Sequence, residues 1–258
     1  MISSSLLYVA GIVFNDYFDI EIDKKERLTR PLPSRKITKR KALTIAISSI
    51  IVANVITLVI NWTSFIIAVI LTTIIIAYDY GLKNNDITGP ITMGLARSIN
   101  VVLGASPALP TLLLSAPSTK MLLFIAISLF LYVVAISILS KKEVSGNATR
   151  LIIISSLSIV FVDIVAIAIA GFIGIFQPAV FVNLTLFSVA IIITFRPILR
   201  GCGNLAPLHI QNIIKNMIMS IIILDSVFVS GIIGLSYGFA TLLLLIPAVV
   251  LARKLYLT

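Results

Sequence analysis

Nine apolar segments joined by short polar connections limit this chain to a narrow range of folds. Most approach the ~20 residues with which an α-helix crosses a bilayer. They are too long and too evenly apolar for the alternating strands of a membrane barrel. We therefore predict an all-α, polytopic membrane bundle of about nine helices. The segments are 2–14, 42–60, 62–78, 90–114, 119–139, 150–175, 177–195, 213–235 and 236–252.

Composition supports a membrane protein and excludes an ordinary soluble domain. The chain is 59% hydrophobic and 12% charged, with a mean hydropathy of +1.13, whereas soluble proteins average about 25% charged residues. A single cysteine, Cys202, excludes an intramolecular disulfide. The segment 1–14 lacks the basic start and cleavage site of a signal peptide, so we expect it to belong to a membrane helix. Without a repeat or linker, 1–258 is predicted to form one domain.

The distribution of basic residues predicts the orientation in the membrane. When the 24–41 connection is placed in the cytoplasm, all but two of the 20 Lys and Arg lie on the cytoplasmic side or next to it. The exceptions are Lys120, on the other side, and Arg97, inside an apolar segment. The net charge of +10 is thus explained by topology, and we expect no nucleic-acid partner. The predicted location is the cell membrane, with several passes and the larger loops in the cytoplasm.

An acidic run stands out in a chain that is poor in carboxylates, because four of its ten Asp and Glu lie within residues 15–23. On a continuous helix, four oxygen-bearing side chains of this run share an arc about 100° wide, and Glu21 points elsewhere. Carboxylates this close repel each other unless a cation lies between them. Oxygen ligands suit Mg²⁺, which shares its shell with phosphate oxygens. The predicted Mg²⁺ ligands are Asn15, Asp16, Asp19 and Asp23.

Basic residues follow the acidic run directly, at positions 24, 25, 27 and 30. They could neutralise a diphosphate bridged to the metal, although an ordinary solvated helix end has similar charges. Two prolines after Arg30 stop the helix and stiffen the loop. We expect Ser34 or Thr38 to cap the next helix, which begins near Lys39. Positive-inside charge alone would explain a single Lys or Arg here, but Arg30 is the strongest candidate for binding a ligand.

These residues resemble the first motif of the UbiA family of membrane prenyltransferases. That motif reads N-D-x-x-D-x-x-x-D, followed by R-P-x-P-S-G. Arg35 stands where the family has its final glycine. A later Tyr and Leu-Lys pair resembles the family's next motif, which implies that Tyr78 and Lys83 face the diphosphate. The residues that match the first motif are Asn15, Asp16, Asp19, Asp23, Arg30, Pro31, Pro33 and Ser34.

The stretch 89–104 reads G-P-x-x-M-G-x-x-R-x-x-N-x-x-L-G and is similar to the EboC-like branch of that family. Its Arg97 and Asn100 are spaced i, i+3 and share a helix face. An arginine within a membrane segment is costly and is a functional candidate by default. The alternative is a structural pair between Arg97 and Asp79 or another acid.

The third stretch, 140–146, corresponds to a loop in which catalytic family members carry a second aspartate-rich motif for a second Mg²⁺. Here it has one carboxylate, Glu143, in a pattern similar to the S-R-x-E of the EboC-like branch. Lys142 could supply part of the positive charge that the second Mg²⁺ would otherwise bring to the diphosphate. A plain basic loop explains these residues about as well.

The resemblance implies a ring of nine helices around a central cavity and a Mg²⁺-assisted transfer of an isoprenyl group from its diphosphate to an unknown acceptor, within membrane lipid. It also implies a further helix ahead of the first motif. Either the reading frame is truncated, or the part of the cavity wall that this helix forms is absent. Rival hypotheses are a non-catalytic relative that binds a polyprenyl lipid or assists metabolite transport, and a secondary transporter. The predicted catalytic residues are Asp16, Asp19, Asp23, Lys83 and Arg97. The predicted substrate-binding residues are Asn15, Arg30, Tyr78, Asn100, Lys142 and Glu143.

Overall fold

The computed structural model describes residues 1–26, 28, 30–109, 111, 115–144, 150–199 and 207–256, and these are helical with short connections. The predicted all-α membrane bundle is thus confirmed. The chain divides into two compact units, Met1–Phe130 and Leu131–Thr258, each of which is described by itself. The organisation as one domain stays a prediction.

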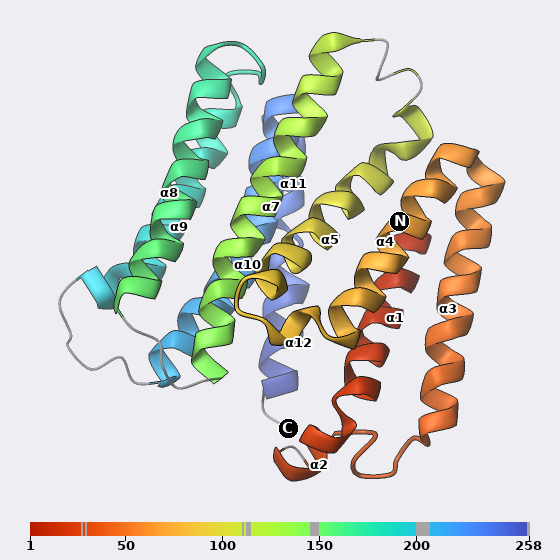
Figure 1. Ribbon diagram of the computed structural model, residues 1–258. Coiled ribbons are helices and arrows are strands. Elements are labelled where there is room, and N and C mark those ends of the chain that lie inside the picture. The colour runs from red at the N-terminus through yellow and green to blue at the C-terminus, as the bar shows by residue number, and fades with distance from the viewer. Residues whose placement is uncertain are drawn as a thin grey trace. The chain divides into compact units, whose positions relative to one another are not determined.

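The first unit contains the N-terminal helices and two single turns of 3₁₀-helix (Figure 1). Helix α7 (Ala116–Val144) begins in this unit and ends in the second. The other elements are α1 (Ile2–Phe18), α2 (Ile20–Glu26), α3 (Lys39–Ile60), α4 (Trp62–Tyr80), η1 (Leu82–Asn84), α5 (Thr88–Ala105) and η2 (Ser106–Ala108).

The second unit contains the end of α7 and five further helices. These are α8 (Arg150–Phe172), α9 (Val180–Leu199), α10 (Pro207–Ile232), α11 (Leu235–Leu242) and α12 (Leu245–Tyr256). The last predicted segment, 236–252, is therefore two helices rather than one. Pro247 explains the break, because proline donates no backbone hydrogen bond and its ring clashes with the carbonyl four residues earlier, at Leu243. Around the break, Leu243, Leu244 and Ile246 donate to carbonyls three residues back.

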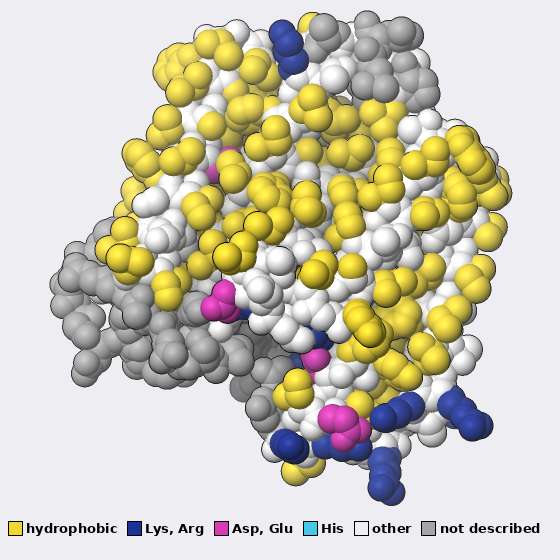
Figure 2. All heavy atoms as spheres, viewed as in Figure 1, with side chains coloured by type: hydrophobic (Ala, Val, Ile, Leu, Met, Phe, Trp, Pro, Cys, Tyr) yellow, Lys and Arg dark blue, Asp and Glu magenta, His cyan; other side chains and the backbone are white. Residues whose placement is uncertain are grey.

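Six helices within the described residues are long and apolar enough to cross a membrane. Their bulky apolar side chains are exposed, for example Ile47, Ile51 and Val55 on α3, as expected of surfaces that face lipid. Figure 2 shows hydrophobic side chains over much of the visible face, with Lys and Arg gathered around α2 and the loop before α3. The six spans are Lys39–Ile60, Trp62–Tyr80, Pro117–Lys141, Leu151–Phe172, Val180–Pro197 and His209–Ile232.

Small side chains hold the first unit together. One face of α3 is buried and carries only small residues, at positions 42, 46, 49, 53 and 57. Because membrane helices gain little from the hydrophobic effect, small residues that let backbones approach closely stabilise their packing. The core joins α1, α3, α4 and α5 through Leu7, Ala53, Ala68, Leu71 and Leu103.

Three buried polar side chains in the second unit donate to backbone carbonyls of neighbouring helices. The Tyr132 hydroxyl donates to Met217 O at 2.9 Å, and the Ser156 hydroxyl donates to Ala135 O at 3.0 Å. The Asn183 amide donates to Ser226 O at 3.1 Å. Such bonds link the helices of the unit where no water is available.

Gly238 allows α11 to approach α9 and α10 closely. A Cβ at this position would lie 2.5 Å from Asn183 Nδ2, 2.7 Å from Ser230 Cβ and 3.0 Å from the Ser226 carbonyl oxygen. Two of these neighbours are buried side chains and the third is backbone, so none can move away cheaply.

We predict that Gly238→Ala destabilises the protein by about 1–3 kcal/mol, because the added methyl group overpacks this contact. The matched control is Gly104→Ala on α5, where a Cβ meets nothing within 4 Å and should be neutral or slightly stabilising. Thermal unfolding of the purified variants by circular dichroism measures both. Equal melting temperatures for the two variants would contradict the close approach.

The loop between α2 and α3 contains the one described non-glycine residue with a positive φ, Arg35 at 59°. Side chains with a Cβ are strained in this left-handed region. Arg35 is also the residue that replaces the glycine of the UbiA motif. The loop then enters α3 through Thr38, whose hydroxyl accepts from the Lys41 N–H at 3.3 Å. Of the two predicted caps, Thr38 is the correct one.

Arg35→Gly should stabilise the protein by about 1 kcal/mol, since glycine adopts this conformation without strain. Arg40→Gly, on the exposed first turns of α3, should instead cost up to about 1 kcal/mol through lost helix propensity. The opposite signs of the two changes in melting temperature form the test. A loss of stability for Arg35→Gly would show that no strain is stored there.

Candidate functional site

The acidic run lies where α1 passes into α2, and Asp19 separates the two helices. The Asp19 N–H still donates to Asn15 O at 3.0 Å. Its own carbonyl accepts from both Ile22, at 2.9 Å, and Asp23, at 2.8 Å, which tightens the turn. The helix that was predicted to run unbroken from Asn15 to Asp23 is therefore interrupted at Asp19.

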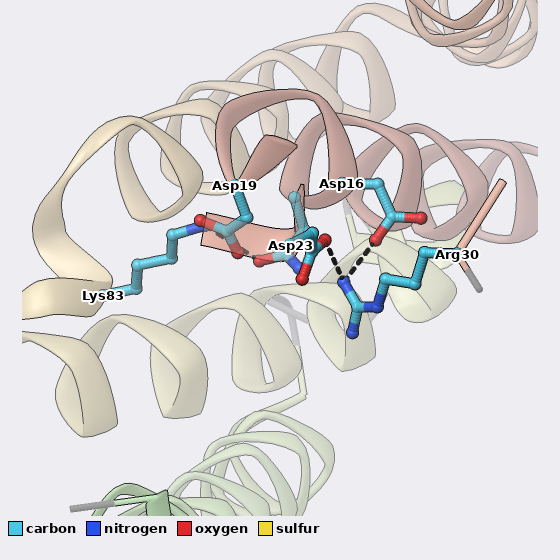
Figure 3. A network of polar contacts seen from close by, with 6 residues as sticks. Asp16, Asp19, Asp23, Arg30 and Lys83 are labelled. Carbon is cyan, nitrogen blue, oxygen red and sulfur yellow. Dashed lines mark hydrogen bonds and ion pairs between the residues drawn. The ribbon is translucent and has the colours of Figure 1, made fainter. Parts of the chain in front are cut away.

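Arg30 bridges two of the carboxylates despite the break (Figure 3). Its Nη1 atom donates to Asp16 Oδ1 at 2.8 Å and to Asp23 Oδ2 at 2.8 Å. Asp23 is almost fully buried, with an exposed fraction of 3%. A buried carboxylate needs such a partner, because the charge would otherwise be costly to keep away from water.

Lys83 binds the third carboxylate from the opposite side. Its Nζ lies 2.6 Å from Asp19 Oδ1 and donates to Asn15 Oδ1 at 3.0 Å. Three carboxylates thus face two cationic side chains, and the cluster keeps one formal negative charge. By contrast, Glu21 points away, as predicted, and pairs with Lys24 at 2.9 Å and with Lys39 at 3.6 Å on the surface.

Local packing explains how residues from separate segments meet here. Leu32, two residues after Arg30 in the loop, packs into a small core with Ile20 and Ala42, which holds the loop against α2 and α3. At the other side, Phe18 contacts Tyr80 edge to face at 5.9 Å. That contact fixes the end of α1 beside the end of α4, so Lys83 on the following turn reaches Asp19.

Crowding and burial affect the protonation of the cluster. Burial raises the pKa of the Asp16 carboxyl above its usual range, Arg30 opposes this, and the neighbouring carboxylates of Asp23 and Asp19 add to it. An additional cation at this place would relieve the repulsion and favour the charged form.

The possible metal ligands in this cluster suit a hard divalent cation, since all of them are carboxylate or amide oxygens. Within the described part of the chain, no three His, Cys, Asp or Glu converge closely enough to form a ready metal site. Instead, the Arg30 nitrogen occupies the place between Asp16 and Asp23. One cationic group already fits between these oxygens, so the residues fit a small cation that competes with Arg30.

A cavity of about 800 Å³ extends from this cluster along α1. At one end it is lined by Asn15, Asp16 and Arg30, together with Tyr78 and Asp79 from the last turn of α4. Its walls are mostly apolar, with the side chains of Leu7, Val9, Ile12, Leu71, Ile75 and Met93. The lining reaches back to Ser4, twelve residues before Asp16, which is about 18 Å along a helix.

Arg97 and Asn100 line the same cavity, deeper along α5. The Arg97 guanidinium lies 5.3 Å above the centre of the Tyr8 ring. Ser4 donates a hydrogen bond to the Asn100 side-chain oxygen. Within the described residues, no ion pair joins Arg97 to Asp79 or to another acid, so the alternative of a structural pair finds no support there.

Sequence analysis missed the contributions of Ser4 and Tyr8. A signal was present, because Ser4, Tyr8, Gly11 and Asn15 follow the i, i+4, i+7, i+11 spacing of one helix face. That face is the one that lines the cavity. Two other predicted residues, Lys142 and Glu143, belong to the second unit, where α7 ends, and their side chains lie outside the described part.

Comparison with known proteins identifies the family. Residues 1–201 match the model of the UbiA prenyltransferase family, and the chain belongs to this family. Similar proteins include the digeranylgeranylglyceryl phosphate synthases of Pyrococcus horikoshii, 31% identical over 96 residues, and of Sulfurisphaera tokodaii, 33% identical over 104 residues. The matches cover 37% and 40% of this chain, and 35% and 37% of those proteins.

The chain thus matches little more than a third of the length of these relatives. A solved structure reported for digeranylgeranylglyceryl phosphate synthase in membranes superposes with a TM-score of 0.60 at 21% identity, over 89% of this chain and 85% of that one. This likeness shows the fold. The finer resemblance to the EboC-like branch stays a prediction.

Arg30→Gln is expected to lower stability by about 1–3 kcal/mol, because two carboxylates, one of them buried, lose their shared donor. Adding MgCl₂ should then raise the melting temperature of this variant more than that of the wild type, since the ion no longer competes with a guanidinium. Lys24→Gln, which breaks only a surface pair, should behave like the wild type within about 0.5 kcal/mol. Equal Mg²⁺ responses of wild type and Arg30→Gln would refute a cation position between Asp16 and Asp23.

Proposed function

We propose that the protein is a membrane prenyltransferase that transfers an isoprenyl group from an isoprenyl diphosphate to an acceptor and releases pyrophosphate. The observation that carries this proposal is the position of the acidic cluster with Arg30 and Lys83 at one end of a long, apolar-walled cavity. A charged head and an apolar tail on one substrate match these two environments.

The diphosphate head would bind where Arg30 and Lys83 meet the carboxylates. A Mg²⁺ ion held by Asn15, Asp16, Asp19 and Asp23 would supply charge neutralisation to the leaving pyrophosphate. Arg30 is suited to phosphate because its planar fork can donate two parallel hydrogen bonds, and Lys83 contributes a compact positive charge. Both side chains already lie within 3.0 Å of the acidic cluster's oxygens.

The isoprenyl tail would lie along the apolar walls between α1, α4 and α5. Burying hydrocarbon there is favourable by about 25 cal/mol per Å² of apolar surface removed from water. The same walls keep water away from the reacting carbon, which protects an electron-poor allylic centre from hydrolysis.

The reaction requires one bond to form and one to break. An electron pair of the acceptor forms a bond to C1 of the isoprenyl group, and the C1–O bond breaks with its electron pair leaving on pyrophosphate. The acceptor then loses a proton to solvent or to the departing pyrophosphate. Arg30 and Lys83 stabilise the negative charge that grows on the leaving oxygen, and Tyr78 lies at the same end of the cavity.

The location that follows from this proposal is the cell membrane, with the 24–41 loop and the site on the cytoplasmic side. The concentration of basic residues in that loop supports this orientation. Soluble pyrophosphate would leave toward the cytoplasm while the prenylated product stays in lipid. The name of the relatives suggests geranylgeranyl diphosphate as the first donor to test.

Asp19→Asn should lower Mg²⁺-dependent release of pyrophosphate from geranylgeranyl diphosphate by roughly a hundredfold or more, because the leaving group loses electrostatic stabilisation. Glu21→Gln is the matched control, since it changes a carboxylate two residues away that points out to solvent, and it should retain wild-type activity. The measurement uses purified protein in nanodiscs with a supplied acceptor panel. Tight binding of the donor without turnover by the wild type would support the non-catalytic lipid-binding hypothesis instead.

A further inference from the structure

The segment around the connection from α2 to α3 carries a high density of positive charge. Residues 24–41, which we call the basic loop, contain nine Lys and Arg and one acidic residue. Arg30 is held by the acidic cluster. Lys24 and Lys39 share the carboxylate of Glu21. Figure 2 shows the Lys and Arg side chains of this part gathered at the bottom of the view, next to hydrophobic ones. Five further cations are exposed and make no ion pair with a described residue: Lys25, Arg35, Lys36, Arg40 and Lys41.

Bulky apolar side chains are exposed among these cations. Leu28 is 68% exposed, and Ile22 and Ile37 are exposed as well. The backbone beside them is nonetheless fixed, because hydrogen bonds close residues 30–37 into a turn and Leu32 is buried in the core below. Apolar groups held beside Lys and Arg are typical of a segment that lies in a membrane surface, with its apolar side chains at the boundary between headgroups and acyl chains.

Arg35 gives an independent indication that the basic loop binds something outside the chain. Its φ of 59° strains a residue with a Cβ, whereas glycine adopts it freely. The side chain is exposed and makes no ion pair within the described residues, so no ion pair of the protein offsets this cost. Strained residues persist where they serve a function. What arginine offers here over glycine is a cation that reaches away from the loop.

We propose that the basic loop binds the phosphate headgroups of anionic phospholipids, with Arg35 and Lys36 as the principal contacts. The partner is a lipid surface because the loop leads directly into the membrane span Lys39–Ile60 and therefore lies where that span leaves the bilayer. Arginine can donate two parallel hydrogen bonds to a phosphate, and lysine adds a compact charge. Clusters of about four to eight Lys and Arg beside a membrane helix attract anionic lipid in this way. The inference does not depend on the proposed prenyl transfer.

Native mass spectrometry of the full chain in detergent measures the binding of individual lipids. Dioleoyl phosphatidylglycerol, which is anionic, is compared with dioleoyl phosphatidylcholine, which has the same acyl chains and no net charge. We expect the anionic lipid to bind about tenfold more tightly or better. Arg35→Gln and Lys36→Gln should each weaken its binding about fivefold, because each removes one charge beside the phosphate. Arg35→Lys keeps the charge and should retain most of the affinity.

Lys120→Gln is the matched control for the loss of one exposed positive charge. Lys120 is the only Lys or Arg between Arg97 and Lys141, so its replacement should leave the affinity for the anionic lipid unchanged. Arg35→Gly separates the charge from the backbone strain. It should weaken binding of the anionic lipid about as much as Arg35→Gln does, although it raises the melting temperature.

Fluorescence quenching locates Leu28 relative to the bilayer without a change in charge. Leu28→Trp, in a Trp62→Phe background, is reconstituted into phosphatidylglycerol vesicles. We expect lipids brominated on their acyl chains to quench this tryptophan and aqueous acrylamide to quench it only weakly. The wild type is the reference, because its only tryptophan, Trp62, begins the membrane span Trp62–Tyr80.

Three results would overturn the proposal. They are equal affinity of the wild type for the two lipids, unchanged affinity for the anionic lipid in both Arg35→Gln and Lys36→Gln, and quenching of Leu28→Trp by acrylamide alone. Displacement of the anionic lipid by inorganic pyrophosphate at constant ionic strength would also overturn it, because the basic loop would then belong to the diphosphate site. None of these measurements involves turnover, so their failure leaves the proposed function untouched.

Discussion

Three carboxylates on adjoining turns stay close together in this protein because Arg30 and Lys83 neutralise them from two sides. Each cation comes from a segment that the rest of the fold must position. Leu32 fixes the loop that carries Arg30, and the contact between Phe18 and Tyr80 brings the turn with Lys83 beside α1. Apolar contacts therefore place both cations where the clustered carboxylates need them.

The same ion pairs bear on how a substrate would enter. A divalent cation alone must compete with Arg30 for Asp16 and Asp23, whereas a cation that arrives with a diphosphate offers Arg30 and Lys83 new acceptors in exchange. Desolvation of charged groups is costly unless each is paired again. Joint binding of cation and diphosphate is therefore favoured over binding of either alone, and the cavity beyond holds the tail.

The sequence predicted much of this arrangement because helix periodicity and charge are local properties. The apolar segments, the Thr38 cap and the shared face of Arg97 and Asn100 all follow from spacing within one helix. The spacing did not predict the break at Asp19, whose carboxylate pairs with Lys83 from another segment. The only sign of the positive φ of Arg35 was the glycine that the UbiA motif has at this position. The hydrogen bond from Ser4 to Asn100 likewise joins residues on two helices that are 96 positions apart in the sequence. The polar face of α1 indicated only that Ser4 takes part in such contacts.

The most direct test of the central claim is a cryo-EM structure with Mg²⁺ and a non-reactive thiolo analogue of geranylgeranyl diphosphate. We predict the analogue's diphosphate at the end of the cavity, with Arg30 and Lys83 turned from Asp16, Asp23 and Asp19 onto its oxygens and the tail between α1, α4 and α5. An analogue bound elsewhere, with both sets of ion pairs intact, would contradict it.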